Sequence, residues 1–209
     1  MLQDPLVEDP VTLDGTVARL LNAAVACIAR VGVTKTTLDD VAREAGCSRA
    51  TLYRYFPGKS PLLRALVIRE AAALEVELQA AAAGAPTLED AAVAIVLRAA
   101  EWLARHPALQ FVMTAEPDVL LPHLAFEGAD RVLLAGARVI APALSRFFAL
   151  GGSESVEALR ASEWLARMIL SYASSPADSV DLADPISVRR LVADFIVPGL
   201  ASLSDASRR

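Results

Sequence analysis

Apolar side chains recur three and four positions apart along most of the chain, the spacing that places them on one face of an α-helix. The first such stripe occupies residues 14–31 and is followed by Gly32, a residue type that commonly ends helices. We therefore expect the first helix to end at Gly32. The same pattern, interrupted by glycine, proline, serine and aspartate, predicts further helices at residues 37–45, 48–56, 60–83, 87–106, 108–115, 122–150, 153–174 and 185–203.

Residues suited to capping stand at several of these boundaries. Thr36 or Thr37 can cap the second helix and Ser48 the third, because a hydroxyl accepts hydrogen bonds from the first helical amides. Ser60 and Pro61 have the order of an N-cap and a first helical residue. These residues predict where the second, third and fourth helices begin.

Other boundary signals lie further along the chain. Thr87 and Asp90 form a pair like a capping box at the start of the fifth helix. Pro142 should kink or divide the seventh helix, and Pro198 with Gly199 predicts a kink or an early end in the last one. With about nine helices, the pattern predicts an all-α fold.

The chain is rich in apolar residues, at 55% of its 209 residues, which raises the possibility of a membrane segment. Its most apolar stretch, residues 132–150, contains Arg138 and Arg146, and no uncharged run approaches the roughly 20 residues of a membrane-spanning helix. The first residues are acidic, whereas a signal peptide begins with basic ones. We expect a cytoplasmic protein with no membrane partner.

Charge is distributed unevenly around a net value of −5. Residues 16–69 contain nine basic and three acidic side chains, a local excess of +6, whereas residues 70–209 carry −7. The overall charge argues against a nucleic-acid partner, but its distribution favours one for the N-terminal part.

Few residues suggest a metal, cofactor or catalytic site. Cys27 and Cys47 have no second cysteine or histidine at ligand spacing, so we expect buried thiols and neither a disulfide framework nor a zinc site. His106 and His123 are isolated beside prolines, where helix-end and surface roles fit best. With no nucleophile near a base and no glycine-rich phosphate loop, we expect neither an enzyme nor a cofactor.

The second and third predicted helices have the features of a helix-turn-helix. Ala42 is small where the two helices would touch, and Gly46 allows the tight turn between them. Leu38 and Val41 face inward from the second helix, and Leu52 faces inward from the third. This spacing lets two helices cross steeply and leaves the outer face of the second one available for a DNA groove.

The remaining positions of the third helix cannot all turn inward around Leu52 and Phe56. Arginine can bind guanine edges, alanine and threonine can contact a thymine methyl group, and tyrosine can donate to phosphates. Thr37 and Lys59 stand beside the starts of the second and fourth helices, where backbone amides also favour phosphate. The candidate DNA contacts are Thr37, Arg49, Ala50, Thr51, Tyr53, Arg54, Tyr55 and Lys59. The alternative is a solvated basic face with two packing tyrosines.

Residues 20–69 resemble the DNA-binding head of the TetR family of transcriptional regulators. The resemblance rests on a helix that ends at Gly32, the segment TTLDDVAREAG and the segment SRATLYRYFPGK, without a gap. It implies a homodimer that binds palindromic double-stranded operator DNA, usually as a repressor, and is released by a small molecule. By motif, Arg49, Ala50 and Thr51 would lie at base edges, and Thr37, Tyr53, Tyr55 and Lys59 on phosphates.

The resulting organisation has three parts: a disordered arm at residues 1–12, a helix-turn-helix DNA-binding domain at 13–60, and a ligand-binding and dimerisation domain at 61–209. Two other classes stay open. The first is a helical carrier of small molecules whose head no longer binds DNA; loss of Arg49, Tyr53 or Lys59 would have favoured it. The second, a helical enzyme, would need polar side chains that converge in a pocket.

The last two predicted helices are apolar on more than one face, so each needs a second partner besides its own core. A symmetry-related copy would supply that partner in a four-helix interface. The expected interface residues are Trp164, Ile169, Tyr172, Leu191, Phe195 and Ile196.

A pocket for a small apolar or amphipathic effector is expected among the fourth to eighth helices. Its candidate lining residues are Trp102, Phe111, Met113, Phe126, Arg131, Arg138 and Met168. For the apolar ones, core packing is the alternative. The two arginines share a helix face and could receive an acidic ligand, or they could form exposed bridges to Glu127 or Asp130.

Overall fold

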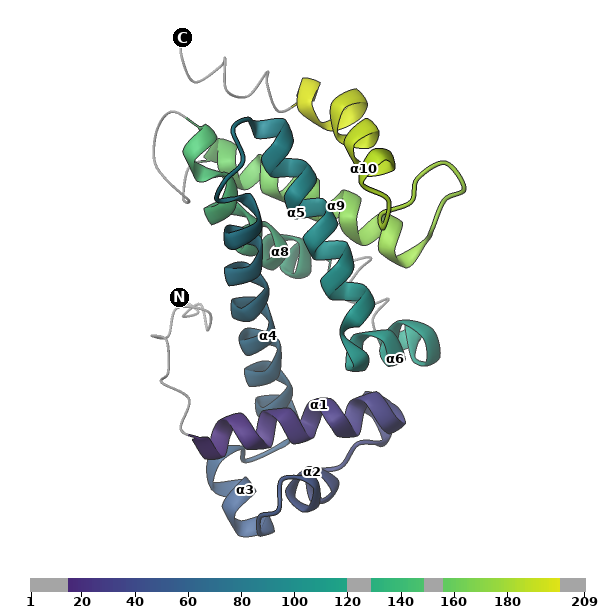
Figure 1. Cartoon of the computed structure of the whole chain (residues 1–209). Helices are drawn as coiled ribbons and strands as arrows, with labels where there is room; N and C mark the ends of the chain where they lie inside the picture. Colours follow the sequence, from purple (N-terminus) through teal and green to yellow (C-terminus); the bar gives the residue numbers. More distant parts are fainter. Residues whose placement is uncertain (1–14, 120–128, 149–155, 200–209) are drawn as a thin grey trace.

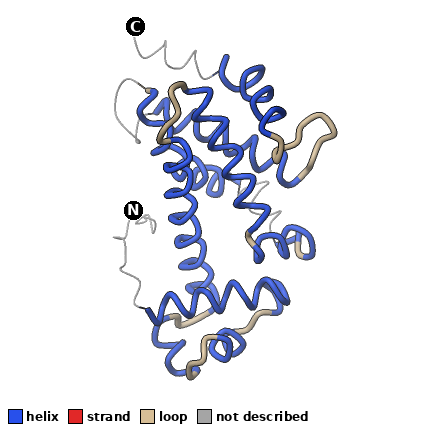
Figure 2. Tube along the Cα trace, viewed as in Figure 1, coloured by secondary structure: helices blue, strands red, loops and turns tan. Residues whose placement is uncertain are grey.

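The computed structural model describes residues 15–119, 129–148 and 156–199, and these residues are almost entirely helical (Figures 1 and 2). Within these ranges there is no strand, although Ala177 and Val180 form an isolated antiparallel β-bridge. The predicted all-α fold is confirmed. The expected arm at residues 1–12 lies outside the described residues.

Three helices form the head: α1 (Gly15–Lys35), α2 (Leu38–Glu44) and α3 (Arg49–Tyr55). Figure 1 shows α1 lying across this end of the molecule, with α2 and α3 on the side away from the other helices. By length and composition α1 would be able to span a membrane. Its apolar side chains are instead packed into the core of the head, among them Leu20, Leu21, Ala24, Cys27 and Ile28.

Gly32 ends the first helical segment of α1, as predicted, and a second short segment follows it to Lys35 across a kink. Gly32 has a φ of 85° and a ψ of 171°, a conformation that side-chain-bearing residues rarely adopt. The predicted stop is therefore a break in the helix axis. Immediately after it, the Thr36 hydroxyl donates a hydrogen bond to the Gly32 carbonyl at 2.6 Å, and Thr36 is buried.

The caps of the two short helices agree with the sequence. Thr37 caps α2, with its hydroxyl accepting from the Asp40 amide at 3.2 Å, and Ser48 caps α3 by accepting from the Thr51 amide at 3.1 Å. Gly46 lies between the helices at a φ of 64°. These local contacts produce a compact helix-turn-helix.

The predicted start of the fourth helix is wrong by two residues. Helix α4 (Lys59–Ala82) begins at Lys59, its N-cap is Gly58, and Ser60 is already helical. Pro61 occupies the third helical position instead of the first. This position is tolerated because the first four amides of a helix have no partner within it, so a missing N–H costs nothing there.

The body contains α5 (Leu88–Arg105), α8 (Ala129–Leu144), η2 (Ser145–Phe147), α9 (Val156–Ser174) and α10 (Pro185–Leu191). The predicted capping pair holds, since Thr87 accepts from the Asp90 amide at 3.1 Å. Of the helix expected at 122–150, the described part ends at Leu144, two residues after Pro142, and continues as the 3-10 turn η2.

The last helix changes its winding before Pro198. After α10 the chain forms a π-helical turn, η4 (Val192–Ile196), and the Val197 amide bonds to the Val192 carbonyl five residues earlier. Proline has no amide hydrogen for the carbonyl four residues before it, and its ring crowds that carbonyl. The widened turn lies directly before the proline, and the chain stays helical through Gly199, so the predicted early end does not occur before that residue.

The side chains form two hydrophobic cores. One lies in the body, among α4, α5, α8, α9, α10 and η4. The other lies in the head and also contains Leu62 and Leu66 of α4 and Ala108 and Val112 of α6 (Pro107–Ala115). Packing therefore does not separate the chain at residue 60, because α6 contributes to the core of the head.

Besides its packing in the body core, the far end of α4 is bound by an arginine of another element. The guanidinium of Arg146 donates to the carbonyls of Ala82, Ala83 and Ala85 at 2.6–2.7 Å. The last carbonyls of a helix have no partner within it, and a cation there also interacts favourably with the helix dipole. Arg146, which lies in η2, thus supplies hydrogen-bond donors to carbonyls at the C-terminus of α4.

Candidate nucleic-acid interface and effector cavity

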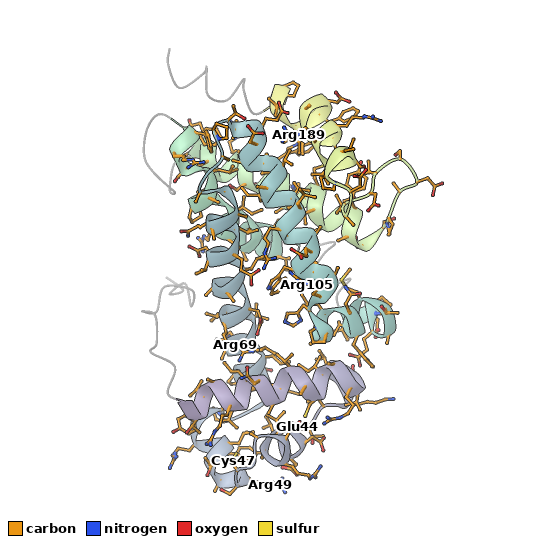
Figure 3. All side chains as sticks on the ribbon, in the orientation of Figure 1. Glu44, Cys47, Arg49, Arg69, Arg105 and Arg189 are labelled. Carbon is orange, nitrogen blue, oxygen red and sulfur yellow. The ribbon has the colours of Figure 1, made fainter. Side chains whose placement is uncertain are left out.

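Helix α3 is buried on one face and open on the other. Leu52 and Phe56 are buried in the head core, whereas Arg49, Ala50, Tyr53 and Arg54 are exposed. Figure 3 places Arg49 at the end of the head opposite the body. The outer face of α3 therefore presents the residue types that the sequence predicted for base and phosphate contacts.

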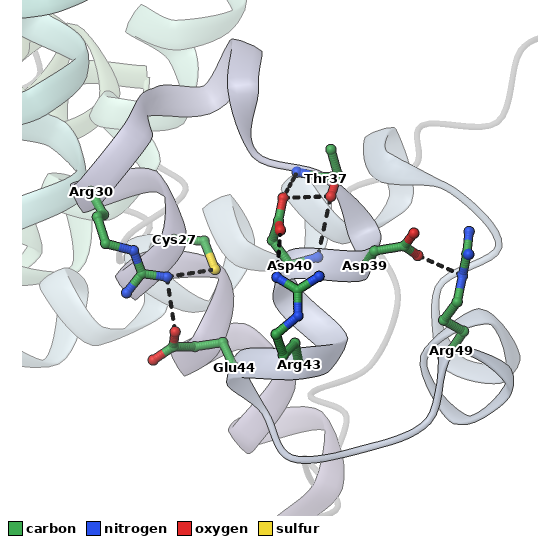
Figure 4. Close-up of polar contacts among 8 residues, drawn as sticks. All are labelled: Cys27, Arg30, Thr37, Asp39, Asp40, Arg43, Glu44 and Arg49. Atoms are coloured by element: carbon green, nitrogen blue, oxygen red, sulfur yellow. Dashed lines mark hydrogen bonds and ion pairs between the residues drawn. The ribbon is translucent and has the colours of Figure 1, made fainter.

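Arg49 is held in a defined direction by Asp39 of α2. Its Nε lies 2.6 Å from Asp39 Oδ1, while two thirds of the arginine side chain stays exposed (Figure 4). An Nε contact leaves the Nη1 and Nη2 edge of the guanidinium for a second, bidentate partner. Sequence reasoning assigned Asp39 no role, and its adjacency to Arg49 depends on the crossing of α2 and α3.

The two other acidic residues of the head are also paired with arginines. Arg43 Nη1 lies 3.0 Å from Asp40 Oδ1, and Arg30 Nη2 lies 2.9 Å from Glu44 Oε2 (Figure 4). Both pairs are largely exposed, so each adds little stability. Three of the nine basic residues at 16–69 are therefore paired with the three acidic ones, and the local excess of +6 comes from the other six.

Thr37 is already engaged in the cap of α2. Its hydroxyl donates to Asp40 Oδ2 at 2.5 Å, and its amide donates to the same oxygen at 3.2 Å. The Thr37 hydroxyl hydrogen bond is the main reason that the pKa of Asp40 is lowered. A DNA phosphate at Thr37 would have to compete with this carboxylate for the hydroxyl proton.

Thr51 and Tyr55 have roles within the fold. Thr51 Oγ1 lies 2.9 Å from Ser48 Oγ, and the half-buried Tyr55 packs against the head core. The Arg54 guanidinium carbon is 5.1 Å from the centre of the Tyr55 ring, within the range of a cation–π contact. The packing of Tyr55 holds the second half of α3 against the head core, whereas the other two contacts lie within α3 and its N-cap.

Lys59 is turned toward the protein. Its Nζ donates to the carbonyls of Val33 and Thr34 at 2.6 and 3.2 Å, and its side chain is half-buried. An ammonium group has three hydrogens, so one is left for a phosphate. The structure therefore gives Lys59 a second role that the sequence did not indicate.

A cavity of about 920 Å³ lies beside α5 and α6 under the loop at residues 175–184. Its wall is mainly small and apolar, including Leu97, Ala100, Ala104 and Val180. This volume is within the range of small-molecule sites. The two arginines of its wall are paired with carboxylates, since Arg98 pairs with Glu77 and Glu101, and Arg105 also pairs with Glu101.

One residue of the predicted pocket set, Met113, lines this cavity. Trp102 and Phe111 are half-buried outside its wall, and the Trp102 ring lies 4.9 Å from the His106 ring, centre to centre, at a tilt of 46°. Met168 packs on the body core, and Arg138 is exposed. Phe126, Glu127 and the side chains of Asp130 and Arg131 lie outside the described residues, as does His123.

The predicted interface residues divide into two groups. Ile169, Leu191 and Ile196 are buried in the protomer's own core, and Tyr172 is half-buried in the cavity wall. Trp164 and Phe195 are exposed, at 46% and 69% of their surface. Among the six predicted residues, these two aromatic side chains are therefore the ones that can meet a partner directly.

The two cysteines and His106 contribute to packing and helix capping in the described part of the chain. Cys27 is buried and free, Cys47 is half-buried and free, and burial raises the pKa of the Cys27 thiol although Arg30 opposes this. His106 caps α6 by accepting from the Leu109 amide at 3.2 Å. Within residues 15–119, 129–148 and 156–199, no three metal-binding side chains converge.

Comparison with known proteins agrees with this geometry. The family described as "Bacterial regulatory proteins, tetR family" matches residues 20–66, which span the helix-turn-helix. An uncharacterized HTH-type transcriptional regulator of Mycobacterium bovis, Mb2274c, is 31% identical over 173 residues, covering 82% of this chain and 85% of its own. Another from Mycobacterium tuberculosis, Rv1255c, is 28% identical over 192 residues, covering 91% of this chain and 88% of its own.

Solved structures share the fold over most of the chain. The TetR family repressor AlkX from Dietzia aligns with a TM-score of 0.65 at 23% identity, covering 89% of this chain and 95% of AlkX. The fatty acid degradation regulator FadR from Bacillus halodurans aligns with a TM-score of 0.59 at 17% identity, covering 88% and 97%. Together with the outward face of α3, these similarities show that the chain belongs to the TetR family of transcriptional regulators.

Proposed function

We propose that this regulator is a homodimeric repressor that binds a palindromic operator through α3 and leaves it when an apolar or amphipathic effector binds the body. The observation that carries the proposal is the open face of α3, where Arg49, Ala50, Tyr53 and Arg54 are exposed around a buried Leu52. A DNA-binding regulator of this kind acts in the cytoplasm.

In the proposed complex, Arg49 recognises a base edge in the major groove. Its Nη1 and Nη2 edge matches the two acceptors of guanine, and Asp39 at Nε keeps that edge pointing outward. Ala50 and Thr51 lie beside it on α3, where they would contact thymine methyl groups. Tyr53 and Arg54, with the remaining hydrogen of Lys59, would contact phosphates.

The proposed dimer uses α9, which exposes Trp164, and the last helix formed by α10 and η4, in which η4 exposes Phe195. Large exposed aromatic side chains are uncommon on a monomer and frequent in protein interfaces. Two copies of the two helices would form a four-helix contact with twofold symmetry. A palindromic operator would mirror that symmetry, with one half-site for each head.

The proposed effector site is the cavity beside α5 and α6. Its apolar wall and carboxylate-paired arginines favour a ligand with a hydrocarbon body over a multiply charged one. The names of two structural relatives support a ligand of this kind. AlkX is implicated in biodegradation of n-alkanes, and FadR is a fatty acid degradation regulator.

DNA selection tests the first part of the proposal. Duplexes bound by the full chain are selected from a random pool, and fluorescence anisotropy then compares the selected duplex with a scrambled one. Arg49→Ala should weaken binding to the selected duplex by roughly 5- to 150-fold, with a smaller loss on scrambled DNA, because it loses a bidentate base contact. Arg138→Ala, the same change of charge at an exposed site on α8 outside the head and the proposed dimer contact, is the control.

Two results would count against this assignment. Equal losses on both duplexes for Arg49→Ala would remove its role in sequence recognition. Failure of the wild-type chain to enrich any duplex would overturn DNA binding and favour the carrier with an inactive head.

Ligand titration tests the effector site. Saturated fatty acids and n-alkanols of increasing length should raise the melting temperature, because they bind the folded state, and should lower affinity for the selected duplex. Ala100→Phe, which fills the cavity wall, should abolish both effects. Ala72→Phe, on the exposed side of α4, should leave them intact, and a ligand effect that survives Ala100→Phe would place the site elsewhere.

A further inference from the structure

The residue after α6 binds Val33 and Thr34, which follow the kink in α1 at Gly32 and are called the corner of the head. Glu116, the residue after α6, accepts a hydrogen bond from the Val33 amide at 2.6 Å through Oε2 and one from the Thr34 amide at 3.1 Å through Oε1. These partners are separated by more than eighty residues in the sequence. One carboxylate therefore joins the body side of the molecule to the part of the head that leads into α2.

Gly32 makes this close approach possible. A Cβ atom at residue 32 would lie 2.5 Å from the carboxyl carbon of Glu116, a separation that real side chains do not show. The positive φ of Gly32 also turns the next two amides toward the carboxylate. The glycine thus serves both the bend in α1 and the contact with Glu116.

Lys59 also binds the corner, through its carbonyl groups instead of its amides. Its ammonium binds the carbonyls of Val33 and Thr34, whose amides bind Glu116. The start of α4 and the end of α6 therefore meet at two consecutive residues of the head. A carboxylate on amides and an ammonium on carbonyls are the pairings that partial charges of the backbone favour.

The other end of α6 is also attached. His106 accepts from the Leu109 amide, and its Nε2 lies 3.4 Å from Glu70 Oε2 on α4. Arg69, which binds Glu70, donates to Asn22 of α1 at 2.7 Å. With Ala108 and Val112 in the head core, α6 is held to the head along its whole length.

We propose that Glu116 is a positioning residue for DNA recognition, which sets the orientation of the head relative to the body. The inference rests on the proposed function, because in a dimer this orientation determines the separation of the two α3 helices. Fixing it lets the dimer distinguish operators by the spacing of their half-sites. Without the Glu116 contact, α6 keeps its core packing and its contact with Glu70, but the head orientation is less strictly fixed and the dimer tolerates a wider range of spacings.

The ionised state of Glu116 is the one the corner favours. Burial by itself opposes ionisation, but hydrogen bonds from Thr34 and from the Val33 amide, with Lys59 nearby, outweigh it and hold the pKa below its ordinary 4.5. Near neutral pH the carboxylate is therefore charged and available to both amides.

Hydrogen exchange tests the contact without DNA. In the full chain, the amides of Val33 and Thr34 should be protected, and Glu116→Ala should remove that protection, while Glu116→Gln, which keeps one carbonyl acceptor, should retain part of it. Asp118→Asn, an exposed acidic neighbour outside the contact, is the matched control. Unchanged exchange in Glu116→Ala would overturn the proposal at its first step.

A spacing series tests the consequence. The duplex selected by the wild-type chain is lengthened or shortened by one base pair between its half-sites, which rotates one half-site by about 35°. The wild type should lose roughly tenfold in affinity, and Glu116→Ala should lose clearly less while binding the original spacing more weakly. Glu116→Gln should fall between them, and Asp118→Asn should match the wild type.

The outcomes separate this inference from the proposed function. If the wild type selects no duplex, the proposed function fails, whereas the exchange result still judges the contact. If Glu116→Ala keeps the wild-type spacing penalty, or weakens binding equally on all spacings and on an isolated half-site, the positioning role is overturned.

Discussion

Arg49 combines exposure with a fixed direction, and both properties matter for a residue that would recognise a base. A free arginine loses side-chain entropy when it binds, on the order of 1 kcal/mol or more. The ion pair with Asp39 restricts Arg49 before any contact with DNA, while its terminal nitrogens remain accessible. The structure therefore makes Asp39 part of the candidate interface, although its charge alone would repel phosphates.

Replacement of Asp39 shows whether this residue mainly orients Arg49 or mainly repels DNA phosphates. Asp39→Asn should reduce the ratio of operator to scrambled affinity by about fivefold or more, because the loss of orientation affects base contacts and the lost negative charge helps all DNA equally. Anisotropy with both duplexes measures the ratio. Glu44→Gln removes a different exposed pair of the head, with Arg30, and should leave the ratio unchanged. An increase for Asp39→Asn would mean that Asp39 masks Arg49.

Sequence reasoning at this scale succeeded for contacts within a few residues. The caps at Thr37 and Ser48 and the positive φ of Gly46 involve neighbours three positions away or less, so residue type and spacing suffice to predict them. It missed the partners of Arg49 and Lys59, which come from other elements. It also misplaced the start of α4, because proline fits several positions of a first helical turn.

At the scale of elements, α6 is unusual because it belongs to the core of the head although it follows α5 in the chain. Its apolar stripe predicted a helix, but nothing in that stripe indicated which element would cover it. The break in α1 at Gly32 creates the corner that receives the end of α6.

Two glycine substitutions measure how much the conformation of Gly32 and its close approach to Glu116 contribute to the free energy of unfolding. Gly46→Ala, at a φ of 64° with open space around it, should cost about 1–2 kcal/mol of unfolding free energy from backbone strain alone. Gly32→Ala should cost more, because strain of about 1–3 kcal/mol is joined by a clash with Glu116. Urea unfolding monitored by circular dichroism gives both values.

The double variant isolates the clash. Gly32→Ala combined with Glu116→Ala should be less destabilised than the two single variants added together, since removal of the carboxylate opens space for the new methyl group. Strict additivity of the two losses would show that the alanine and the carboxylate do not interact.

Asp90 connects α5 to α10 and should give stability a defined pH dependence. Hydrogen bonds from Thr87, then from Arg189, lower its pKa below the ordinary 3.8. A carboxylate with a lowered pKa stabilises the fold fully above its unfolded pKa, and this contribution is lost as the pH falls through the folded value.

Unfolding at several pH values checks this expectation. Asp90→Asn should be less stable than the wild type near neutral pH, and the difference should shrink as the pH falls below 3.8. Asp178→Asn, an exposed site in the loop at residues 175–184, provides a control for general charge effects. A difference that stays constant at all pH values would contradict an ionised role for Asp90.

At the scale of the whole molecule, the exposed Trp164 and Phe195 are the strongest indication of association. Phe195→Asp should shift a dimer toward monomers of 22.1 kDa, because it places a charge in the proposed contact. Sedimentation equilibrium measures the change. Leu191→Ala, whose side chain lies in the protomer's own core, should instead lower stability by about 2–5 kcal/mol and preserve the association; a wild type that sediments as a monomer would overturn the dimer.

The sequence by itself determined the helices, most of their caps and the outward face of α3. These features depend on periodicity and on contacts within one or two helical turns, which residue order specifies directly. The resemblance over residues 20–69 added the family, which is confirmed.

The tertiary structure alone decided which faces meet. An apolar stripe shows that a helix face is covered and leaves the covering element open. Ile169, Leu191 and Ile196 were therefore predicted at a subunit interface and lie in the protomer's core, while the cavity formed beside α5 under a loop. The contact of Glu116 with Val33 joins residues 83 positions apart, a distance over which only the packing of the whole chain brings a carboxylate to two backbone amides.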